Sequence, residues 1–394
     1  MTATALPPGA TATPAPTRAP ATTTAVTVRP QRHGGVDRTG LLMGLAAAGS
    51  ALCLTWLLYE VILPFNGTPG FVVLWYVSFL ALLWATVREA RGRPAASDTV
   101  MTVVVATGAL AMFVPLALVV GFVLYKGLGA IRPHFFTQSA EFCGQLDPAT
   151  CGGVGHAVVG TLEQVGIGIV LSVPLAVLCA VFLNEIGGPL KRPIQLVVDA
   201  MSGVPSIVAG LFIYAVWVVG LQRGFTGFGA SLALAILMLP TVTRTSVEVL
   251  RLVPDGLREG ALALGASEWR TTWSVVLPTA RSGLITAVIL GVARAVGETA
   301  PLILTSFGSS VINRNPLSGP QEALPHYVYT YITFNPGTGP YQRAWSAALT
   351  LTFLVLALFT LARLVGARMS VESRQRRSAR RLARRPEPTG GAIS

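Results

Sequence analysis

The chain has 394 residues, of which 52% are hydrophobic and only 12% are charged. A soluble globular protein carries about 25% charged residues, so this composition excludes a fully water-exposed surface and predicts a membrane protein. The net charge of +12 does not indicate nucleic-acid binding, because the basic residues lie between apolar runs and in the C-terminal tail, where they can face anionic lipid headgroups.

Residues 1–36 are rich in Thr, Ala and Pro and are predicted to form a disordered cytoplasmic tail. Eight apolar runs follow, each near or above the roughly 20 residues that a membrane-spanning helix needs. The predicted spans are 41–64, 70–88, 99–126, 157–184, 196–220, 228–250, 282–306 and 344–367. We therefore predict an all-α polytopic membrane protein of about eight transmembrane helices. A shallow hairpin is the alternative for the first two runs, because the second run is short.

Lys and Arg gather on one side of the predicted membrane. They are frequent after the second, fourth and sixth spans and in the basic tail, residues 368–394. The connections poorer in positive charge are 65–69, 127–156, 221–227 and 307–343. The positive-inside rule therefore predicts that both termini are cytoplasmic. Cys143 and Cys151 then lie outside, where an oxidising compartment would allow a disulfide, with two free thiols as the alternative.

The sequence contains no G-x-x-x-x-G-K-[ST] phosphate-binding loop, so the chain does not hydrolyse ATP by that route. No catalytic triad and no cluster of metal ligands stands out either. We predict that this chain has no catalytic residue, no metal and no cofactor of its own.

The longest cytoplasmic connection, residues 251–281, has a pattern of its own. Ala and Leu recur at helical spacing from Leu257 to Leu264, Gly265 interrupts the run, and a second apolar stretch ends at Pro278. This pattern predicts two short helices joined at a glycine. They either rest on the chain's own membrane domain or insert into a groove of another protein.

Five positions in this connection resemble the EAA loop of ABC importer permeases. They are Glu259, Ala261, Gly265, Leu277 and Pro278. The chain departs from the family pattern at Gly260 and Val275, where the family has Ala and Ile. The resemblance implies that these positions couple the chain to a separate ATPase subunit.

Three further segments, 202–212, 239–254 and 293–302, resemble phosphate-import permeases, the last of them those of the PstA type. The resemblance implies a six-helix type I ABC importer permease core over residues 99–367, preceded by an additional transmembrane hairpin at 37–98. The implied function is that of the membrane-spanning subunit of an ATP-driven inorganic phosphate importer. Such a chain is a transporter subunit and not an enzyme.

The resemblance also implies partners. These are a second permease subunit of the PstC type, two copies of an ATPase subunit that bind ATP and Mg, and a periplasmic or lipid-anchored phosphate-binding protein, all at the bacterial inner membrane. The alternatives are a permease for sulfate or molybdate, a membrane-embedded enzyme that acts on lipid phosphate, and a passive channel.

Charged residues inside the predicted spans are candidates for the substrate pathway. Arg294 and Glu298 are four residues apart in the seventh span, so one helix would place both on the same face. Arg244 lies in the sixth span, and Ser206 lies in the segment 202–212. A guanidinium offers paired donors that suit phosphate oxygens. The alternative is that Arg294 and Glu298 only neutralise each other.

Overall fold

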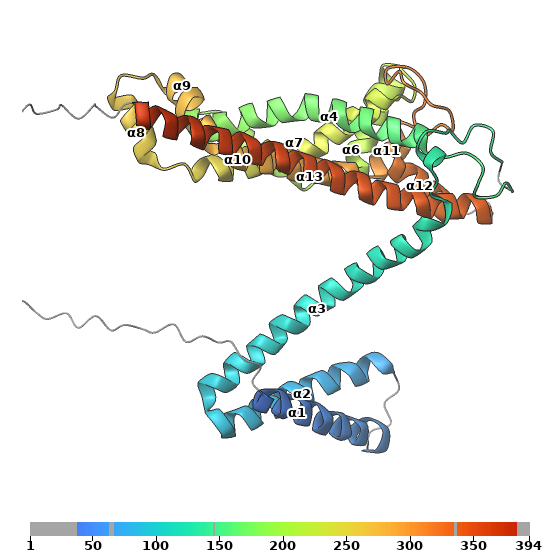
Figure 1. The fold of residues 1–394 in the computed structure, drawn as a ribbon, viewed down its shortest axis with the longest axis vertical. Helices are drawn as coiled ribbons and strands as arrows, with labels where there is room; N and C mark the ends of the chain where they lie inside the picture. Colours follow the sequence, from blue (N-terminus) through green and yellow to red (C-terminus); the bar gives the residue numbers. More distant parts are fainter. Residues whose placement is uncertain (1–37, 63–66, 145, 335–336, 384–394) are drawn as a thin grey trace, which may run out of the picture. The chain divides into compact units, whose positions relative to one another are not determined.

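The structure is a computed structural model that describes residues 38–62, 67–144, 146–334 and 337–383 (Figure 1). The predicted tail at 1–36 lies outside these residues. The chain divides into two compact units, Met1–Met112 and Phe113–Ser394, and the division falls inside helix α3 (Arg93–Gly127). The predicted domain boundary between residues 98 and 99 stays a prediction.

Unit 1 contains a pair of apolar helices. Its elements are α1 (Arg38–Trp56), the π-helical turn η1 (Leu57–Ile62), α2 (Thr68–Arg91) and the first part of α3. Helices α1 and α2 pack together around Ala47, Leu83 and Val87, and the indole N–H of Trp75 donates to the carbonyl of Ala48 at 3.3 Å. Both helices are long and apolar enough to cross a membrane.

Unit 2 is a helical bundle whose longest contact runs between α4 and α7, with α10 packed on α7 and on α13 (Figure 1). Its α-helices are α4 (Gly155–Val181), α5 (Lys191–Ser202), α6 (Ser206–Ile213), α7 (Gly227–Arg251), α8 (Asp255–Ala263), α9 (Glu268–Thr271), α10 (Leu277–Val296), α11 (Ala300–Thr305), α12 (Leu324–Thr333) and α13 (Thr338–Ala383). Short turns of other helical types are η2 (Leu128–Ala130), η3 (Pro133–Phe136), η4 (Phe182–Ile186), η5 (Tyr214–Gly220) and η6 (Thr272–Val276).

The core of the bundle combines apolar side chains with small residues. Val165 of α4, Leu234 and Met238 of α7 and Val296 of α10 are buried in one cluster. Gly291 of α10 leaves room for Val242 of α7. Small residues at helix contacts let helices approach closely in membrane proteins, where packing replaces the hydrophobic effect between helices.

Seven helices of the described residues are long and apolar enough to span a membrane, and α5 with α6–η5 makes an eighth if a bent pair counts as one span. The prediction of a single span over 196–220 needs correction, because α5 and the following helix meet at an angle of 105°. Pro205 has no N–H and restricts the residue before it, so the helix stops ahead of it and restarts at Ser206.

The seventh predicted span, 282–306, also differs from the structure. An apolar helical run extends from Glu268 to Val296, so the second short helix of the cytoplasmic connection continues into the membrane segment and does not end at Pro278. Pro278 is tolerated in the first turn of α10 because the π-helical turn η6 precedes it. The i→i−4 hydrogen bond that a proline would remove from an α-helix is already altered there. A break at residues 297–299 then separates α10 from α11.

The two ends of unit 2 carry different kinds of connection. Helices α8 and α9 lie at one end, and α12 lies at the other (Figure 1). The basic connection 251–281 is thus separated from the connection 307–343, which is poorer in positive charge. The last span continues as a helix to Ala383, into the predicted basic tail, and residues 384–394 lie outside the described part. The cytoplasmic placement of the α8 end stays a prediction.

Candidate functional site

Helix α8 lies at the tip of unit 2 and begins with Asp255, whose charge favours the helix N-terminus. The helix ends at Ala263, and Gly265 has a φ of +81°, a left-handed conformation that favours glycine. The N–H of Gly265 donates to the carbonyl of Leu262 at 2.9 Å. The hydroxyl of Ser267 then accepts from the backbone N–H of Arg270 and caps α9. The predicted glycine turn between two helices is confirmed.

Large apolar side chains are exposed on α8, on α9 and on the turns that follow them. We call this set the docking surface. It consists of Leu257 (44% exposed), Leu262 (44%), Leu264 (91%), Trp269 (62%) and Trp273 (45%). The rings of Trp269 and Trp273 are 5.3 Å apart, and the charged residues Glu259 and Arg270 are exposed beside them. Apolar side chains exposed among charged ones indicate a surface that another protein covers.

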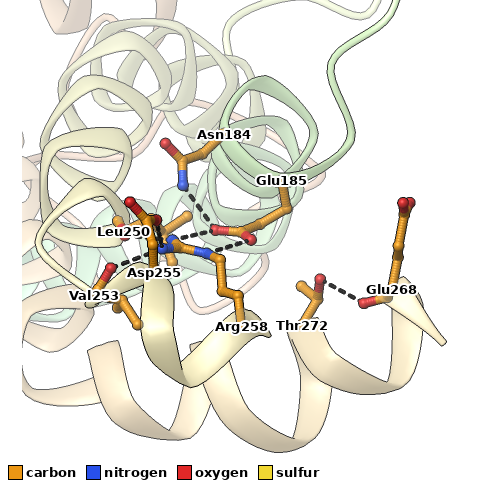
Figure 2. Close-up of polar contacts among 8 residues, drawn as sticks. All are labelled: Asn184, Glu185, Leu250, Val253, Asp255, Arg258, Glu268 and Thr272. Carbon is orange, nitrogen blue, oxygen red and sulfur yellow. Dashed lines mark hydrogen bonds and ion pairs between the residues drawn. The ribbon is translucent and has the colours of Figure 1, made fainter. Parts of the chain in front are cut away.

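Arg258 fastens α8 to the rest of unit 2 (Figure 2). Its Nε and Nη2 donate to the two carboxylate oxygens of Glu185 at 3.1 and 2.9 Å. Its Nη1 donates to the carbonyl of Val253 at 2.7 Å and to the carboxylate of Asp255 at 2.9 Å, and Nη2 also donates to the carbonyl of Leu250 at 3.0 Å. The guanidinium therefore satisfies four acceptor groups at once.

This ion pair is largely shielded from water, because the side chains of Arg258 and Glu185 are 19% and 8% exposed. A bidentate ion pair that is shielded from water is stronger and more directional than an ion pair on the surface. The hydrogen bond to Glu185 raises the pKa of Arg258 above its ordinary value, although burial opposes the shift. The Arg258 side chain stays charged.

The partners of Arg258 come from separate elements. Glu185 belongs to η4, which extends α4, and its carboxylate also accepts from the amide of Asn184 at 2.7 Å. Leu250 lies in the last turn of α7 and Val253 in the turn before α8. Carbonyls at a helix C-terminus lack partners within the helix, so Arg258 also caps α7. One side chain thus joins to α8 the ends of α4 and α7 that lie nearest to it.

The structure separates the five predicted coupling positions into two groups. Glu259, Ala261 and Gly265 lie on α8 and in its turn, with Glu259 exposed and Ala261 half-buried. Leu277 and Pro278 lie in the first turn of α10, where half-buried Leu277 packs against a core formed by the ends of α4, α7 and α10. Leu277 therefore stabilises the base of the segment and is not part of the docking surface.

Arg294 and Glu298 do not share a helix, which corrects the prediction from their spacing. Helix α10 ends at Val296, and Glu298 lies beyond Gly297, the residue that caps it. Arg294 Nε and Glu298 Oε1 are nevertheless 3.9 Å apart, with side chains 49% and 20% exposed. The helix stops because Pro301, in the first turn of α11, cannot donate the hydrogen bond that a continuous helix needs. A half-exposed arginine within an apolar helical run requires a partner chain or a water-filled path.

Arg244 has a carboxylate partner of its own. Its Nε and Nη2 donate to Oδ1 of Asp199 in α5 at 3.1 and 2.6 Å. The pair lines a cavity of about 470 Å³ between α5 and α7, which Lys191 also lines. Ser206 begins α6, on the far side of the bend that ends α5, and is half-buried. Arg244 and Arg294 thus pair with different carboxylates on different elements.

The two helix breaks of unit 2 are held close together. Helix α6, which follows the first break, packs against α11, which follows the second. A Cβ at Gly210 of α6 would lie 2.6 Å from Cα of Pro301 in α11, so this approach requires glycine. Interrupted helices at membrane depth are tolerated where they are buried in protein or line a cavity, and they commonly form substrate sites in transporters.

Comparisons with known proteins identify the family. The model of the family "Binding-protein-dependent transport system inner membrane component" matches residues 172–371. Phosphate transport system permease protein PstA 1 of Mycobacterium tuberculosis (strain ATCC 25618 / H37Rv) is 40% identical over 263 residues, which are 66% of this chain and 84% of that protein. The PstA protein of Haemophilus influenzae is 36% identical over 241 residues, 61% of this chain and 83% of that protein. The chain belongs to the PstA family of permease proteins.

The family match, residues 172–371, contains the docking surface, both helix breaks and the contacts of Arg258. A solved structure of the MetNI methionine ABC transporter in an inward-facing conformation is 21% identical, with a TM-score of 0.42, and covers 55% of this chain and 92% of that chain. Unit 1 lies ahead of the matched residues. Because the matched family consists of inner-membrane transport components and the curated relatives are permeases, this PstA-family chain is a multi-span transport component and not an enzyme.

At the other end of unit 2, Cys143 and Cys151 form a disulfide, with Cα atoms 5.7 Å apart. Arg343 of α13 donates to the carbonyl of Cys151 at 2.8 Å. Gly152 follows with a φ of +62°, and a Cβ at this glycine would meet the carbonyl of Ser139. The disulfide and the arginine together fix this loop of the PstA-family chain against its last helix.

Sequence reasoning did not single out Arg258, Glu185 or Asp199. A signal was present, since Glu185 is an acidic residue at the end of an apolar run and Asp199 lies in an amphipathic segment. The pairs themselves join residues 73 and 45 positions apart. Spacing along the chain indicates pairs within one helix, and it cannot indicate a pair that the packing of two helices creates.

Proposed function

We propose that this chain is the PstA-type permease subunit of an ATP-driven inorganic phosphate importer and forms half of its translocation pathway. The observation that carries the proposal is the docking surface on α8 and α9, in a chain whose relatives are phosphate transport permeases. The sequence contains no ATP-binding loop, so another chain supplies the energy. An exposed apolar surface at the end of the bundle is where such a chain can dock.

The partners follow from this assignment. One ATPase subunit docks on α8 of this chain, and a second copy docks on a second permease subunit of the PstC type. ATP and Mg bind to the ATPase subunits and not to this chain. A periplasmic or lipid-anchored binding protein delivers phosphate at the end that carries α12 and the disulfide. The basic residues around α8 support a cytoplasmic position for that end and for both termini.

Arg294 is the proposed anion partner in the pathway. Its guanidinium is half exposed, lies beside a helix break and is neutralised by Glu298 at 3.9 Å. A phosphate that arrives can replace Glu298 as the acceptor, and Glu298 can accept a hydrogen bond from a protonated phosphate. In the absence of phosphate, Glu298 holds Arg294 in place. Arg244 lies closer to the α8 end and remains paired with Asp199.

Uptake by cells that lack this chain tests the substrate. The chain is deleted in its host, restored from a plasmid, and the initial rate of radiolabelled phosphate uptake is measured under phosphate limitation. We expect that the restored chain recovers uptake and that excess sulfate or molybdate does not compete. Loss of sulfate or molybdate uptake on deletion, with unchanged phosphate uptake, would assign the chain to another oxyanion instead.

A further inference from the structure

Helix α8 is held to its own chain mainly by polar contacts. None of its residues is buried, and its large apolar side chains, Leu257 and Leu262, are exposed. A helix of this kind has little apolar packing to fix its position. The contacts of Arg258 with Glu185 and Leu250 join it to the ends of α4 and α7.

A coupling element must be rigidly joined to what it moves. If α8 were free to tilt on its two flanking turns, a movement of a docked ATPase would be absorbed in those turns. The contacts of Arg258 prevent this, because two of its nitrogens bind the end of α4 and one of them also binds the end of α7. Helices α4 and α7 make the most extensive helix–helix contact of unit 2. A displacement of α8 is therefore transmitted to the centre of the bundle.

We propose that Arg258, with Glu185, is a positioning pair that makes α8 and the inner ends of α4 and α7 one rigid body, so that movement of the ATPase is transmitted to the pathway. The inference rests on the proposed function in one respect, since it takes α8 as the docking helix. It adds residues that the coupling segment alone does not contain, because Glu185 lies 73 positions before Arg258.

The geometry explains why the pair needs a guanidinium and a carboxylate. A lysine has one charged nitrogen and cannot reach Glu185, Leu250 and Val253 together, whereas the planar fork of arginine does. Exchange of the two side chains would not restore the link, because a carboxylate at position 258 cannot donate to the two carbonyls. Glutamine at position 185 keeps the shape of Glu185 and removes its charge.

The rigid body can be measured independently of the transported substrate. Spin labels are attached to cysteines at Gly256 on α8 and Ile186 at the end of α4, two exposed positions, with Cys53 and Cys179 replaced by serine. The assembled complex is compared with and without a non-hydrolysable ATP analogue. We expect one narrow distance distribution in both states for the unsubstituted pair. Arg258→Gln and Glu185→Gln should each broaden the distribution and make it depend on nucleotide.

Asp255→Asn is the matched control, because Asp255 contacts Arg258 only within α8 and is 86% exposed. This variant should keep the narrow distribution. Distributions for Arg258→Gln and Glu185→Gln that match the unsubstituted protein in both states would overturn the proposal. Failure of the unsubstituted chain to bind the ATPase would instead contradict the proposed function.

Transport measurements then separate positioning from folding and docking. Arg258→Gln and Glu185→Gln should keep the ATPase bound and keep its basal hydrolysis, while hydrolysis stimulated by the loaded binding protein falls about 10- to 100-fold, as expected when charge-assisted hydrogen bonds are lost. The double variant should be no worse than the worse single variant, since both remove one interaction. Arg258→Lys should recover only part of the stimulation. Unchanged stimulation in both single variants, or loss of the ATPase from the complex, would contradict a positioning role.

Discussion

Arg294 and Glu298 face each other across the end of α10, with Nε and Oε1 3.9 Å apart and Gly297 between the helix and the carboxylate. The acidic residue is therefore carried by an irregular segment and the basic residue by a helix. The backbone N–H of Glu298 still donates to the carbonyl of Ala295 at 3.2 Å, so a move of the carboxylate away from Arg294 needs only a rotation of the Glu298 side chain. This arrangement differs from an ion pair held within one continuous helix.

Replacement of Arg294 tests the anion site. Arg294→Ala should lower phosphate uptake by about 10- to 100-fold, the effect of losing charge-assisted hydrogen bonds of about 1.5–3 kcal/mol. Arg294→Lys should recover little, because a single ammonium does not replace the planar fork. Uptake in cells with equal amounts of assembled complex is the measurement, and Arg363→Ala, at an exposed position of α13, is the control. Near-normal uptake by Arg294→Ala would make Arg294 structural and direct attention to Arg244.

Two glycines of the docking segment should respond in opposite ways to alanine. Gly265 has a φ of +81°, so Gly265→Ala should strain the turn by about 1–2 kcal/mol. Gly260 lies within α8 with no atom near its Cβ position, so Gly260→Ala should stabilise the helix by up to about 1 kcal/mol. Gly265→Ala should release ATPase subunit from the complex in detergent and Gly260→Ala should not, as measured by co-purification. Equal ATPase content in both would show that the turn does not set the docking geometry.

Charge reversal tests the docking surface itself. Glu259 is exposed between the apolar residues of α8, so Glu259→Lys should weaken ATPase binding while the membrane helices still insert. The bulkier change Gly265→Val should have the larger effect, because a β-branched residue disfavours a positive φ. The measurement is the ATPase content of the purified complex and its hydrolysis with loaded binding protein. A full ATPase content in both variants would assign the docking role to another part of the chain.

The contact between the helix breaks predicts a local stability effect. Gly210→Ala places a methyl group against Pro301 and should cost about 1–3 kcal/mol, as overpacked sites do. Gly166→Ala in α4 is the matched control, since no atom lies within 4 Å of its Cβ position. Thermal unfolding of the purified complex should show a lower midpoint for Gly210→Ala only. Equal midpoints would mean that the two breaks are not tightly packed.

The orientation of the chain predicts which positions react with an impermeant thiol reagent. In a background with Cys143 and Cys151 replaced by serine, a cysteine at Ser318 should be labelled in intact cells, because residues 307–343 are predicted to lie outside. A cysteine at Ser378 should be labelled only after the membrane is opened. Labelling of the Ser378 position in intact cells would reverse the orientation.

Much of the fold follows from the sequence because the membrane imposes a simple rule. A membrane-spanning helix needs a long apolar run. Each predicted apolar run of the second unit is helical in the structure, and one of them is a bent pair of helices. The positions of the ends were less predictable. Pro278 was expected to end a helix and lies inside a continuous run, whereas Gly297 and Pro301 end one that was expected to continue. Proline is tolerated in the first turn of a helix and breaks a helix in its interior. The sequence alone does not indicate which of these positions a given proline occupies.

The candidate site was predictable only where it is local. Gly265 indicated the turn, and the spacing of Ala and Leu from Leu257 to Leu264 indicated the short helix before it. The link from Arg258 to Glu185 and the link from Arg244 to Asp199 depend on how α4, α5 and α7 pack. Such contacts arise from tertiary structure, and no pattern within one segment specifies them.

Proteoliposomes that contain the purified complex provide the most direct test of ATP-driven phosphate transport through this chain. Phosphate uptake and ATP hydrolysis are measured together, with loaded binding protein on one side and ATP on the other. We expect phosphate accumulation that requires both ATP and this chain. Accumulation that occurs without ATP, or without this chain, would contradict ATP-driven phosphate transport through it.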